Sequence, residues 1–253
     1  MTLTRAFVTI YLALWCASST QADTAVVRVA VAANFASPMK LLADQFEKET
    51  GNQVLLSVGA TAKLYAQIRS GAPFDIFLAA DEATPERLER ENVIVSGSRF
   101  TYATGRLVLW SAQANGVDAK GDVLKSGNFR YLAIAAPKLA PYGAAAMQTI
   151  NQLGLGERLK PKLVQGESIG QTYSFVASGN AELGFVALSQ VYENGQIQRG
   201  SGWVVPDSLH TPLRQDAVLL AQASGNPAAK AFLAFLKTNN AKTVIRSFGY
   251  AID

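Results

Sequence analysis

The sequence predicts an α/β protein that folds into two lobes around mixed, mostly parallel sheets. Short apolar runs typical of buried strands alternate with amphipathic helical segments along the chain after residue 23. Several of these runs end in a short polar or glycine-containing turn that leads directly into a helix start. In open α/β sheets, ligands bind outside such carboxyl ends of strands.

The first strand and helix show both patterns clearly. Residues 27–33 are almost all apolar, which suits a strand buried on both faces. The next predicted helix, residues 38–50, has apolar residues spaced i, i+3, i+4 and i+7 over 39–46. Ser37 is the expected N-cap, a proline opens the helix, and Gly51 ends it.

The remaining elements follow from the same signals. Thr84 and Asn226 are expected N-caps, because Pro85 and Pro227 follow them and proline is favoured at the first helical position. Further strands are expected at 53–59, 74–80, 105–112, 131–137, 161–166, 181–188, 202–206 and 216–223, and further helices at 62–70, 84–91, within 141–154, 167–179, 226–238 and 241–248.

The order of these elements predicts two crossings between the lobes. Lobe 1 would comprise residues 23–105 and a return segment, 206–253, while lobe 2 would comprise residues 106–205. Two crossings make a hinge and leave a cleft between the lobes. The strand ends that face this cleft are then the expected ligand site.

Residues 1–22 have the pattern of a secretory signal peptide. Arg5 supplies the positive start, and the apolar stretch 6–17 has the length of a secretory signal but is too short to span a bilayer. Cleavage is expected after Ala22, with export from the cytoplasm. Cys16, the only cysteine, would be lost with the signal, so the mature chain would have no thiol chemistry.

Charge and motifs argue against several classes of function. Without Arg5 the net charge falls from +4 to +3, and no run of Lys or Arg suggests a nucleic-acid partner. His210 is the only histidine, so the chain lacks the side chains for a histidine-based metal site or proton relay. We therefore expect no metal, cofactor or catalytic residue. His210 is expected at the surface or hinge. Asp75 and Asp81 do not form an obvious acid–base pair, and Asp81 is expected to cap a helix or anchor the hinge.

Four strand-to-helix junctions are expected to meet at the cleft, at Asn34, Thr61, Tyr142 and Ile169. Helix N-termini expose unpaired N–H groups and carry roughly +0.5 charge each. Several of them aimed at one cleft make an anion site without Lys or Arg. An amide and two hydroxyls can all donate hydrogen bonds, which suits a fully ionised oxyanion without a proton of its own.

Each of these residues also has an ordinary structural interpretation. Thr61 could be a helix N-cap, Asn34 a turn residue, Tyr142 a packed surface aromatic and Ile169 a core side chain that takes part only through its backbone N–H. Lys63, two residues beyond Thr61, is expected to be solvated. The surrounding "GATAKL" is not a phosphate-binding P-loop, because the Gly-Lys-Ser/Thr ending is missing.

Several stretches, among them "VAANFASPMKLLADQFEKETG", "SGAPFDIFLAAD", "APKLAPYG" and "GNAELGFVALSQV", resemble the periplasmic molybdate-binding proteins of bacterial ABC importers. The resemblance implies a type II periplasmic-binding-protein fold. It also implies that neutral donors bind molybdate or tungstate, that the protein delivers the anion to a membrane permease, and that it is not an enzyme. We expect a monomer.

The resemblance also assigns ligand contacts to positions of this chain. One branch of the family has a ligand tyrosine in the strand after "LGxV", where this chain has Ala187, so the phenol would come from the third junction instead. The contacts would fall on the four junction residues and two weaker neighbours: Asn34, Thr61, Tyr142, Ile169, Ala33 and Ala60.

Two alternatives remain open at this point. The ligand could be another tetrahedral oxyanion, such as sulfate, chromate or a phosphate-like anion, because cavity radius cannot be read from the sequence. The chain could also be an enzyme on the same fold, as hydroxymethylbilane synthase is. That enzyme holds its cofactor on a cysteine, however, and the mature chain would have none.

Overall fold

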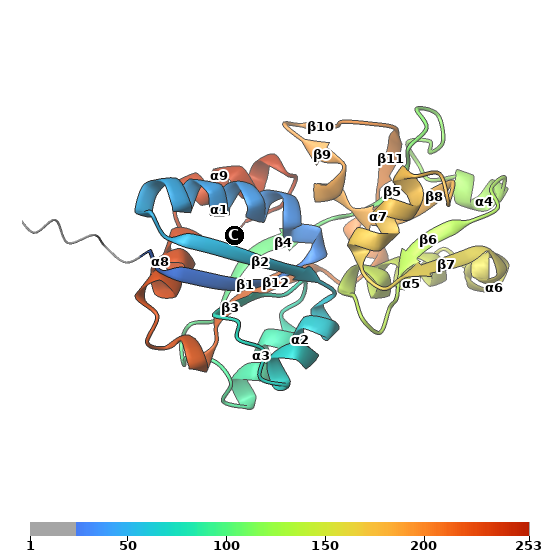
Figure 1. Ribbon diagram of the computed structural model, residues 1–253. Helices are drawn as coiled ribbons and strands as arrows, with labels where there is room; N and C mark the ends of the chain where they lie inside the picture. The colour runs from blue at the N-terminus through green and yellow to red at the C-terminus, as the bar shows by residue number, and fades with distance from the viewer. Residues whose placement is uncertain (1–23, 253) are drawn as a thin grey trace, which may run out of the picture.

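The computed structural model describes residues 24–252 and has two lobes, each built on a five-stranded sheet flanked by helices (Figure 1). The predicted two-lobed α/β fold is confirmed. The two sheets are mixed, with four parallel and four antiparallel strand pairs. The predicted signal peptide, with Cys16, lies outside the described residues. Between residues 24 and 252, no helix is both long and apolar enough to cross a membrane.

The first sheet has the strand order β2-β1-β3-β12-β4. Its first three strands are parallel, and β12 runs antiparallel to both of its neighbours. Strand β4 was not predicted, because its sequence FTYATG is only half buried and lacks a clear apolar pattern. The strands are β1 (Val26–Ala32), β2 (Gln53–Gly59), β3 (Ile76–Leu78), β4 (Phe100–Gly105) and β12 (Leu213–Leu219).

Helices cover both faces of this sheet because β1 is buried on both sides. Val29 lies in one core cluster with the apolar side of α1, whereas Ala30 lies in the opposite cluster with Leu64 of α2. Helices α1, α8 and α9 therefore cover one face, and α2 and α3 the other (Figure 1). Their bounds are α1 (Ala36–Thr50), α2 (Thr61–Arg69), α3 (Ala83–Arg90), α8 (Pro227–Phe235) and α9 (Asn239–Ser247).

The second sheet has the order β11-β5-β8-β6-β7, with α5 packed on one face and α7 on the other. Two short helices and a small hairpin complete this lobe. The bounds are β5 (Leu107–Ser111), α4 (Val123–Ser126), β6 (Leu132–Ala135), α5 (Pro141–Gln152), α6 (Gly156–Leu159), β7 (Leu163–Gly166), α7 (Ile169–Ala177), β8 (Leu183–Ala187), β9 (Tyr192–Glu193), β10 (Gln196–Ile197) and β11 (Ser201–Val204).

The chain passes between the two sheets twice. It leaves the first sheet at Gly105, the end of β4, and enters the second at Leu107, the start of β5. It returns between β11 and β12, on the segment that carries His210. The His210 side chain is buried, with 7% of the residue exposed, so the alternative of a surface position was wrong. Its Nδ1 lies 2.9 Å from the carbonyl oxygen of Thr211.

The start of α1 differs from the prediction. A 3₁₀ turn, η1 (Ala33–Phe35), directly follows β1, and Phe35 rather than Ser37 is the N-cap of α1. The chain has therefore already turned when it reaches Asn34, which lies inside this turn. The predicted end is confirmed, with Gly51 in the left-handed conformation that glycine adopts most easily.

Two other predicted caps can be compared with the structure. Asn226 caps α8, where its side chain accepts hydrogen bonds from two backbone N–H groups. Thr84 is not the cap of α3, because that helix already begins at Ala83. Instead the Asp81 carboxylate accepts hydrogen bonds from the Thr84 N–H, at 2.9 Å, and from its hydroxyl, at 3.1 Å. The N-cap residue of α3 is Glu82, so Asp81 is not the helix cap that was expected; it lies one residue earlier and binds a first-turn N–H.

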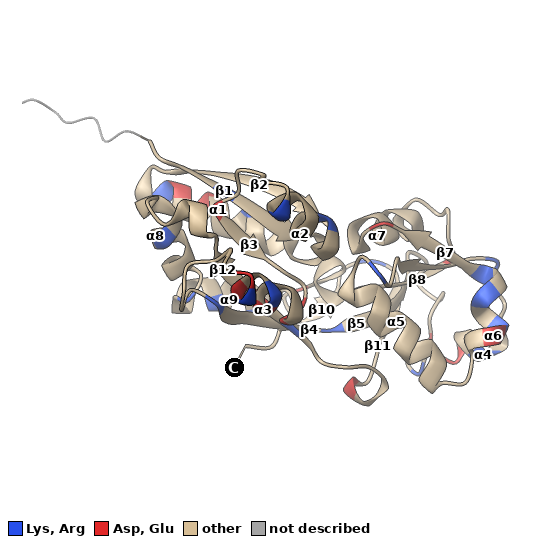
Figure 2. Ribbon diagram, turned by 90° about the horizontal axis from the view of Figure 1, so that it is seen from below, with Lys and Arg blue, Asp and Glu red and all other residues tan. Residues whose placement is uncertain are grey.

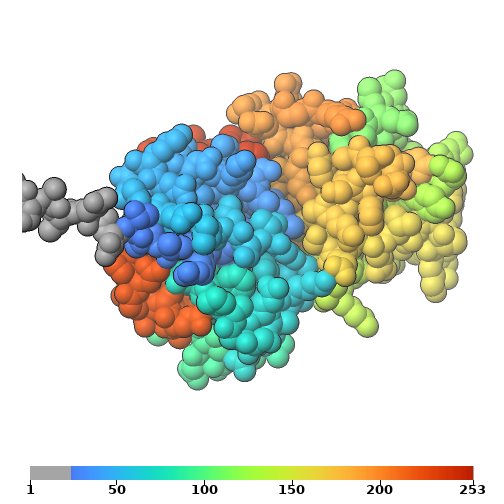
Figure 3. Space-filling view, in the orientation of Figure 1, coloured from blue at the N-terminus to red at the C-terminus, as the bar shows by residue number. Residues whose placement is uncertain are grey.

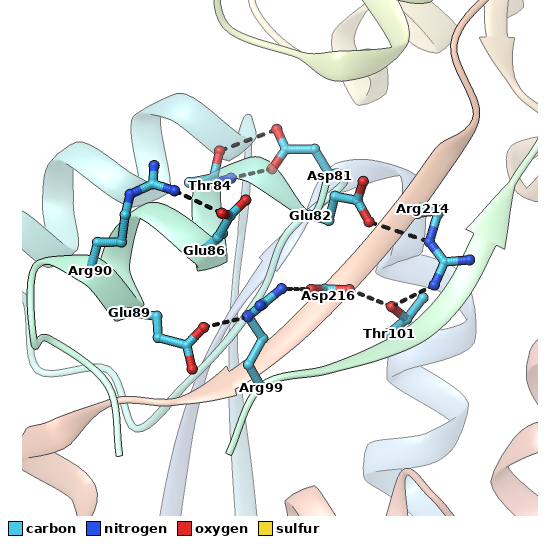
Figure 4. Close-up of polar contacts among 10 residues, drawn as sticks. All are labelled: Asp81, Glu82, Thr84, Glu86, Glu89, Arg90, Arg99, Thr101, Arg214 and Asp216. Atoms are coloured by element: carbon cyan, nitrogen blue, oxygen red, sulfur yellow. Dashed lines mark hydrogen bonds and ion pairs between the residues drawn. The ribbon is translucent and has the colours of Figure 1, made fainter. Parts of the chain in front are cut away.

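A network of charged groups attaches the return strand to the rest of lobe 1 (Figure 4). The Asp216 side chain on β12 is almost fully buried, and it accepts hydrogen bonds from Arg99 at 2.9 Å and from Thr101 at 2.7 Å. Arg99 also pairs with Glu89 of α3 at 2.7 Å. One guanidinium thus joins α3 to β12 and neutralises a buried carboxylate.

We predict that Arg99→Met lowers the free energy of unfolding by about 2–3 kcal/mol, because Asp216 is left buried without its cation. For a chain of this size, the melting temperature should fall by roughly 4–12 °C in a calorimetric scan. Arg90→Met is the matched control, since it removes an ion pair with Glu86 that is exposed at the helix surface. Equal melting temperatures for the two variants would contradict this account of Asp216.

Candidate functional site

All six residues predicted for the site line one small cavity between the lobes. The empty space between these residues is about 180 Å³, and part of it opens to solvent. Only a small ligand could fit there. Its lining contains no charged residue, and the five further lining residues are Ala32, Gly59, Ala80, Ala140 and Pro141.

The topology explains why distant residues meet here. Strands β1 and β2 are parallel, so their carboxyl ends present Asn34 and Thr61 at one edge of the first sheet. Strands β6 and β7 are parallel in the second sheet, and the helices that follow them begin at Pro141 and Ile169. Four helical segments therefore begin at the cavity, each with first-turn N–H groups that have no acceptor inside the helix.

The lobes touch each other beside the cavity, as the space-filling view shows (Figure 3). The N–H of Ala62 in α2 donates to the carbonyl oxygen of Leu139 in lobe 2 at 3.1 Å. Lys63 Nζ lies 2.5 Å from Glu167 Oε2 across the same boundary. Lys63 was expected to be solvated. Its side chain is indeed about half exposed, but it forms an ion pair between the lobes.

The hydroxyl of Thr61 already accepts a hydrogen bond from the protein. Thr61 is 2% exposed, and its Oγ1 accepts from the backbone N–H of Ala80 at 3.1 Å. Thr61 is the first residue of α2, and its side chain does not cap the helix. Because the oxygen accepts from Ala80, the hydroxyl hydrogen remains available to donate to a ligand.

Tyr142, in the opposite lobe, has a hydroxyl that also accepts a hydrogen bond from the protein and keeps its own hydrogen to donate. The residue is 1% exposed, and its Oη accepts a hydrogen bond from Gln215 Nε2 at 3.0 Å. Burial raises the pKa of Tyr142 well above its ordinary value, and the nearby Tyr250 adds to this, while the bond from Gln215 acts the other way. Tyr142 therefore remains protonated and able to donate. Its expected alternative, a packed surface aromatic, was wrong.

The Asn34 side chain was expected to donate to a ligand, but its amide hydrogens already bond to other residues. Its Nδ2 donates to Gln215 Oε1 at 2.8 Å and to Tyr250 Oη at 3.0 Å, which uses both amide hydrogens. The backbone carbonyl oxygen of Asn34 accepts from Ser189 Oγ at 2.7 Å and from Tyr250 Oη at 2.9 Å. The Oδ1 atom is buried and has no hydrogen-bond partner among the described residues. In this arrangement the side chain holds the site together, and the backbone N–H is the group left to donate.

Sequence reasoning missed the hydrogen-bonded residues behind the cavity. Gln215 and Tyr102 come from β12 and β4, and Tyr102 Oη donates to Gln215 Oε1 at 2.8 Å. Tyr250 and Ser189 lie in different lobes, and their hydroxyls are 3.0 Å apart. Gln215 could have been noticed as a polar residue next to an apolar strand run, in "LRQDAVLL". Its partners could not be read from the sequence, because they lie far away along the chain.

A wider vestibule, with about 950 Å³ of empty space, adjoins the cavity and shares several of its lining residues. It carries the charged groups Asp81, Glu82, Lys138 and Arg214. Burial is the main reason that the pKa of Asp81 is raised. Charges of both signs are spread over the helices of both lobes (Figure 2). Within residues 24–252, no group of three or more His, Cys, Asp or Glu could hold a metal ion.

Comparison with known proteins identifies the family. The sequence matches the bacterial extracellular solute-binding proteins over residues 27–251. The chain belongs to this family. Its members are binding proteins, and the matched segment includes every residue of the cavity.

Named relatives are similar over nearly the whole chain. The molybdate-binding protein ModA of Azotobacter vinelandii is 58% identical over 232 residues, which is 92% of each chain. The molybdate-binding protein ModA of Rhodobacter capsulatus is 49% identical, over 90% of this chain and 88% of its own. A solved structure of the periplasmic molybdate-binding protein of Azotobacter vinelandii superposes with a TM-score of 0.87 at 40% identity, covering 90% of this chain and 99% of that one.

The buried phenols generate a prediction about ionisation. The pKa values of Tyr102 and Tyr142 lie well above the ordinary value, and that of Tyr250 is raised to about 12, in each case chiefly by burial. In a spectrophotometric titration of the folded protein to about pH 11, Tyr142→Phe should therefore give the same phenolate absorbance as the unaltered protein. The control is the same pair of proteins unfolded in denaturant, where Tyr142 is no longer buried and Tyr142→Phe should lower the absorbance. A loss of absorbance already in the folded variant would contradict the buried, protonated state of Tyr142.

Proposed function

We propose that this protein is a periplasmic solute-binding protein that captures molybdate or tungstate and delivers it to the membrane permease of an ABC importer. The observation that carries the proposal is the cavity itself. Asn34 and Thr61 of one lobe and Tyr142 and Ile169 of the other line a single small space that contains no charged side chain. A ligand bound there contacts both lobes and holds them together.

The polarity of the cavity favours a fully ionised oxyanion. The hydroxyls of Thr61 and Tyr142 each accept one hydrogen bond from the protein, so both can donate to the ligand. First-turn N–H groups, including that of Ile169, add further donors and the positive ends of helix dipoles. Each hydrogen bond to a charged oxygen contributes on the order of 1.5–3 kcal/mol. A handful of them could reach roughly nanomolar affinity.

The named relatives favour molybdate or tungstate over other tetrahedral anions. The chain is 58% and 49% identical to two proteins named for molybdate binding. A sulfate-binding protein of Mycobacterium tuberculosis has a TM-score of 0.73 but only 12% identity, so that likeness concerns the fold alone. Sulfate, chromate and phosphate-like anions are therefore the weaker alternative.

The proposal also covers export of the protein, closure of its lobes and delivery of the anion. The signal-like residues 1–22 would direct export and be removed near Ala22. The lobes, with boundaries near residues 105 and 205, would close on the anion about the two crossings. The closed monomer would then dock on the permease. We propose no chemical step, since capture and release need only binding.

The first prediction of this function concerns ligand choice. Calorimetric titration near pH 7 should give molybdate and tungstate affinities at least about a hundredfold above that of phosphate. Phosphate carries a proton at this pH, and no carboxylate lines the cavity to accept it. Comparable phosphate affinity would contradict the argument and would point to the unpartnered Oδ1 of Asn34 as an acceptor for the ligand's proton.

The second prediction concerns the source of the affinity. Tyr142→Phe removes one donor and keeps the ring, so molybdate binding should weaken by about 1.5–3 kcal/mol, or roughly ten- to a hundredfold. Lys63→Ala removes the charge closest along the chain to Thr61, yet it should cost less than about fivefold, because its ion pair with Glu167 is exposed. If the Lys63 variant loses more affinity than the Tyr142 variant, the anion is held by charge and the neutral-donor account is wrong.

A further inference from the structure

Gln215 lies directly behind the cavity without lining it. The residue is fully buried on β12, the strand that returns to lobe 1 after the second crossing. Its Oε1 accepts hydrogen bonds from Asn34 Nδ2 and from Tyr102 Oη, each at 2.8 Å. Its Nε2 donates to Tyr142 Oη at 3.0 Å. One carboxamide therefore contacts two cavity residues that belong to different lobes.

A carboxamide fixes the direction of the hydrogen bonds that it makes. Its nitrogen can only donate, so Tyr142 Oη must accept from Gln215 and its own hydrogen must point elsewhere. The hydroxyl of Tyr250 and the carboxamide of Asn34 are the protein groups that also lie close to the Tyr142 hydroxyl. An oxyanion is the stronger acceptor, because hydrogen bonds to ionised groups are shorter and stronger than those between neutral groups.

The chain leaves space for this contact at the first crossing. A Cβ atom added at Gly105 would collide with both Tyr142 Oη and Gln215 Nε2. Glycine at the end of β4 thus allows the tyrosine of lobe 2 to reach the glutamine of lobe 1. The hydrogen bond consequently lies where the two lobes are joined covalently.

We propose that Gln215 is a positioning residue that directs the Tyr142 hydroxyl hydrogen toward the anion, and so selects a fully ionised ligand. The inference rests on the proposed function, because it assigns a role to the same cavity. Gln215 does not touch the ligand. It acts through Tyr142 and holds the Asn34 carboxamide in its present orientation.

The direct test is Gln215→Glu, followed by calorimetric titration with molybdate from about pH 6 to about pH 9.5. Burial raises the pKa of a carboxyl group at this position, so at low pH it is protonated and can still donate to Tyr142. At high pH it is ionised, accepts the Tyr142 hydrogen and repels the anion. Molybdate affinity should fall by at least about tenfold over this range in the variant. It should stay constant in the unaltered protein.

Two further variants separate positioning from folding. Gln222→Glu is the matched control, since Gln222 Nε2 also donates to protein carbonyls but lies at the exposed edge of lobe 1. It should leave affinity unchanged at every pH. Gly105→Ala disturbs the same contact from the other side, and it should weaken binding with no dependence on pH. It also keeps the test available if the Gln215 variant does not fold.

The final arm is a double-mutant cycle with Tyr142→Phe. If Gln215 acts through the Tyr142 hydroxyl, the pH dependence of Gln215→Glu should largely disappear once that hydroxyl is removed. An unchanged pH profile when Gln215→Glu is combined with Tyr142→Phe, or a flat profile in Gln215→Glu alone, would overturn the inference. Failure of the unaltered protein to bind molybdate would instead refute the proposed function.

Discussion

The hydrogen bond from Gln215 to Tyr142 is the interaction on which the arrangement of the site depends. Tyr142 stands at the first turn of α5 in lobe 2, while Gln215 and its partner Asn34 belong to lobe 1. The bond therefore joins the two lobes directly behind the cavity and makes the Tyr142 oxygen an acceptor from the protein. It is buried on all sides, so no water competes for it, and an unpaired amide there would cost free energy.

The cavity is neutral because the charged side chains of the protein lie outside its lining. Ion pairs are present, but they lie elsewhere, as between Arg99 and Asp216 behind the return strand and between Lys63 and Glu167 at the rim. These pairs connect elements and lobes without placing a full charge next to the ligand. The anion is met by oriented dipoles instead. Such groups stabilise charge well in a small cavity that excludes water, where the local dielectric constant is low.

Much of the fold and the lining of the cavity could be predicted from local sequence. Apolar runs followed by helix starts identify the strand ends, and Asn34 and Tyr142 follow from those ends. The prediction failed where an element or a hydrogen bond depends on contacts between residues far apart in the sequence. Strand β4 is recognisable only through its pairing with β12, and Gln215 bonds to a residue 181 positions away. His210 was placed on the return crossing, but its burial depends on how the two lobes pack around it.

The most direct test of the central claim is X-ray diffraction from crystals of the molybdate complex, recorded at the molybdenum absorption edge. The account predicts one anomalous peak in the cavity between Thr61 and Tyr142, with oxygen atoms facing hydroxyl and backbone N–H donors and no Lys or Arg within hydrogen-bonding distance. A peak in the neighbouring vestibule instead, beside Lys138 or Arg214, would contradict it, because the anion would then be held by charge.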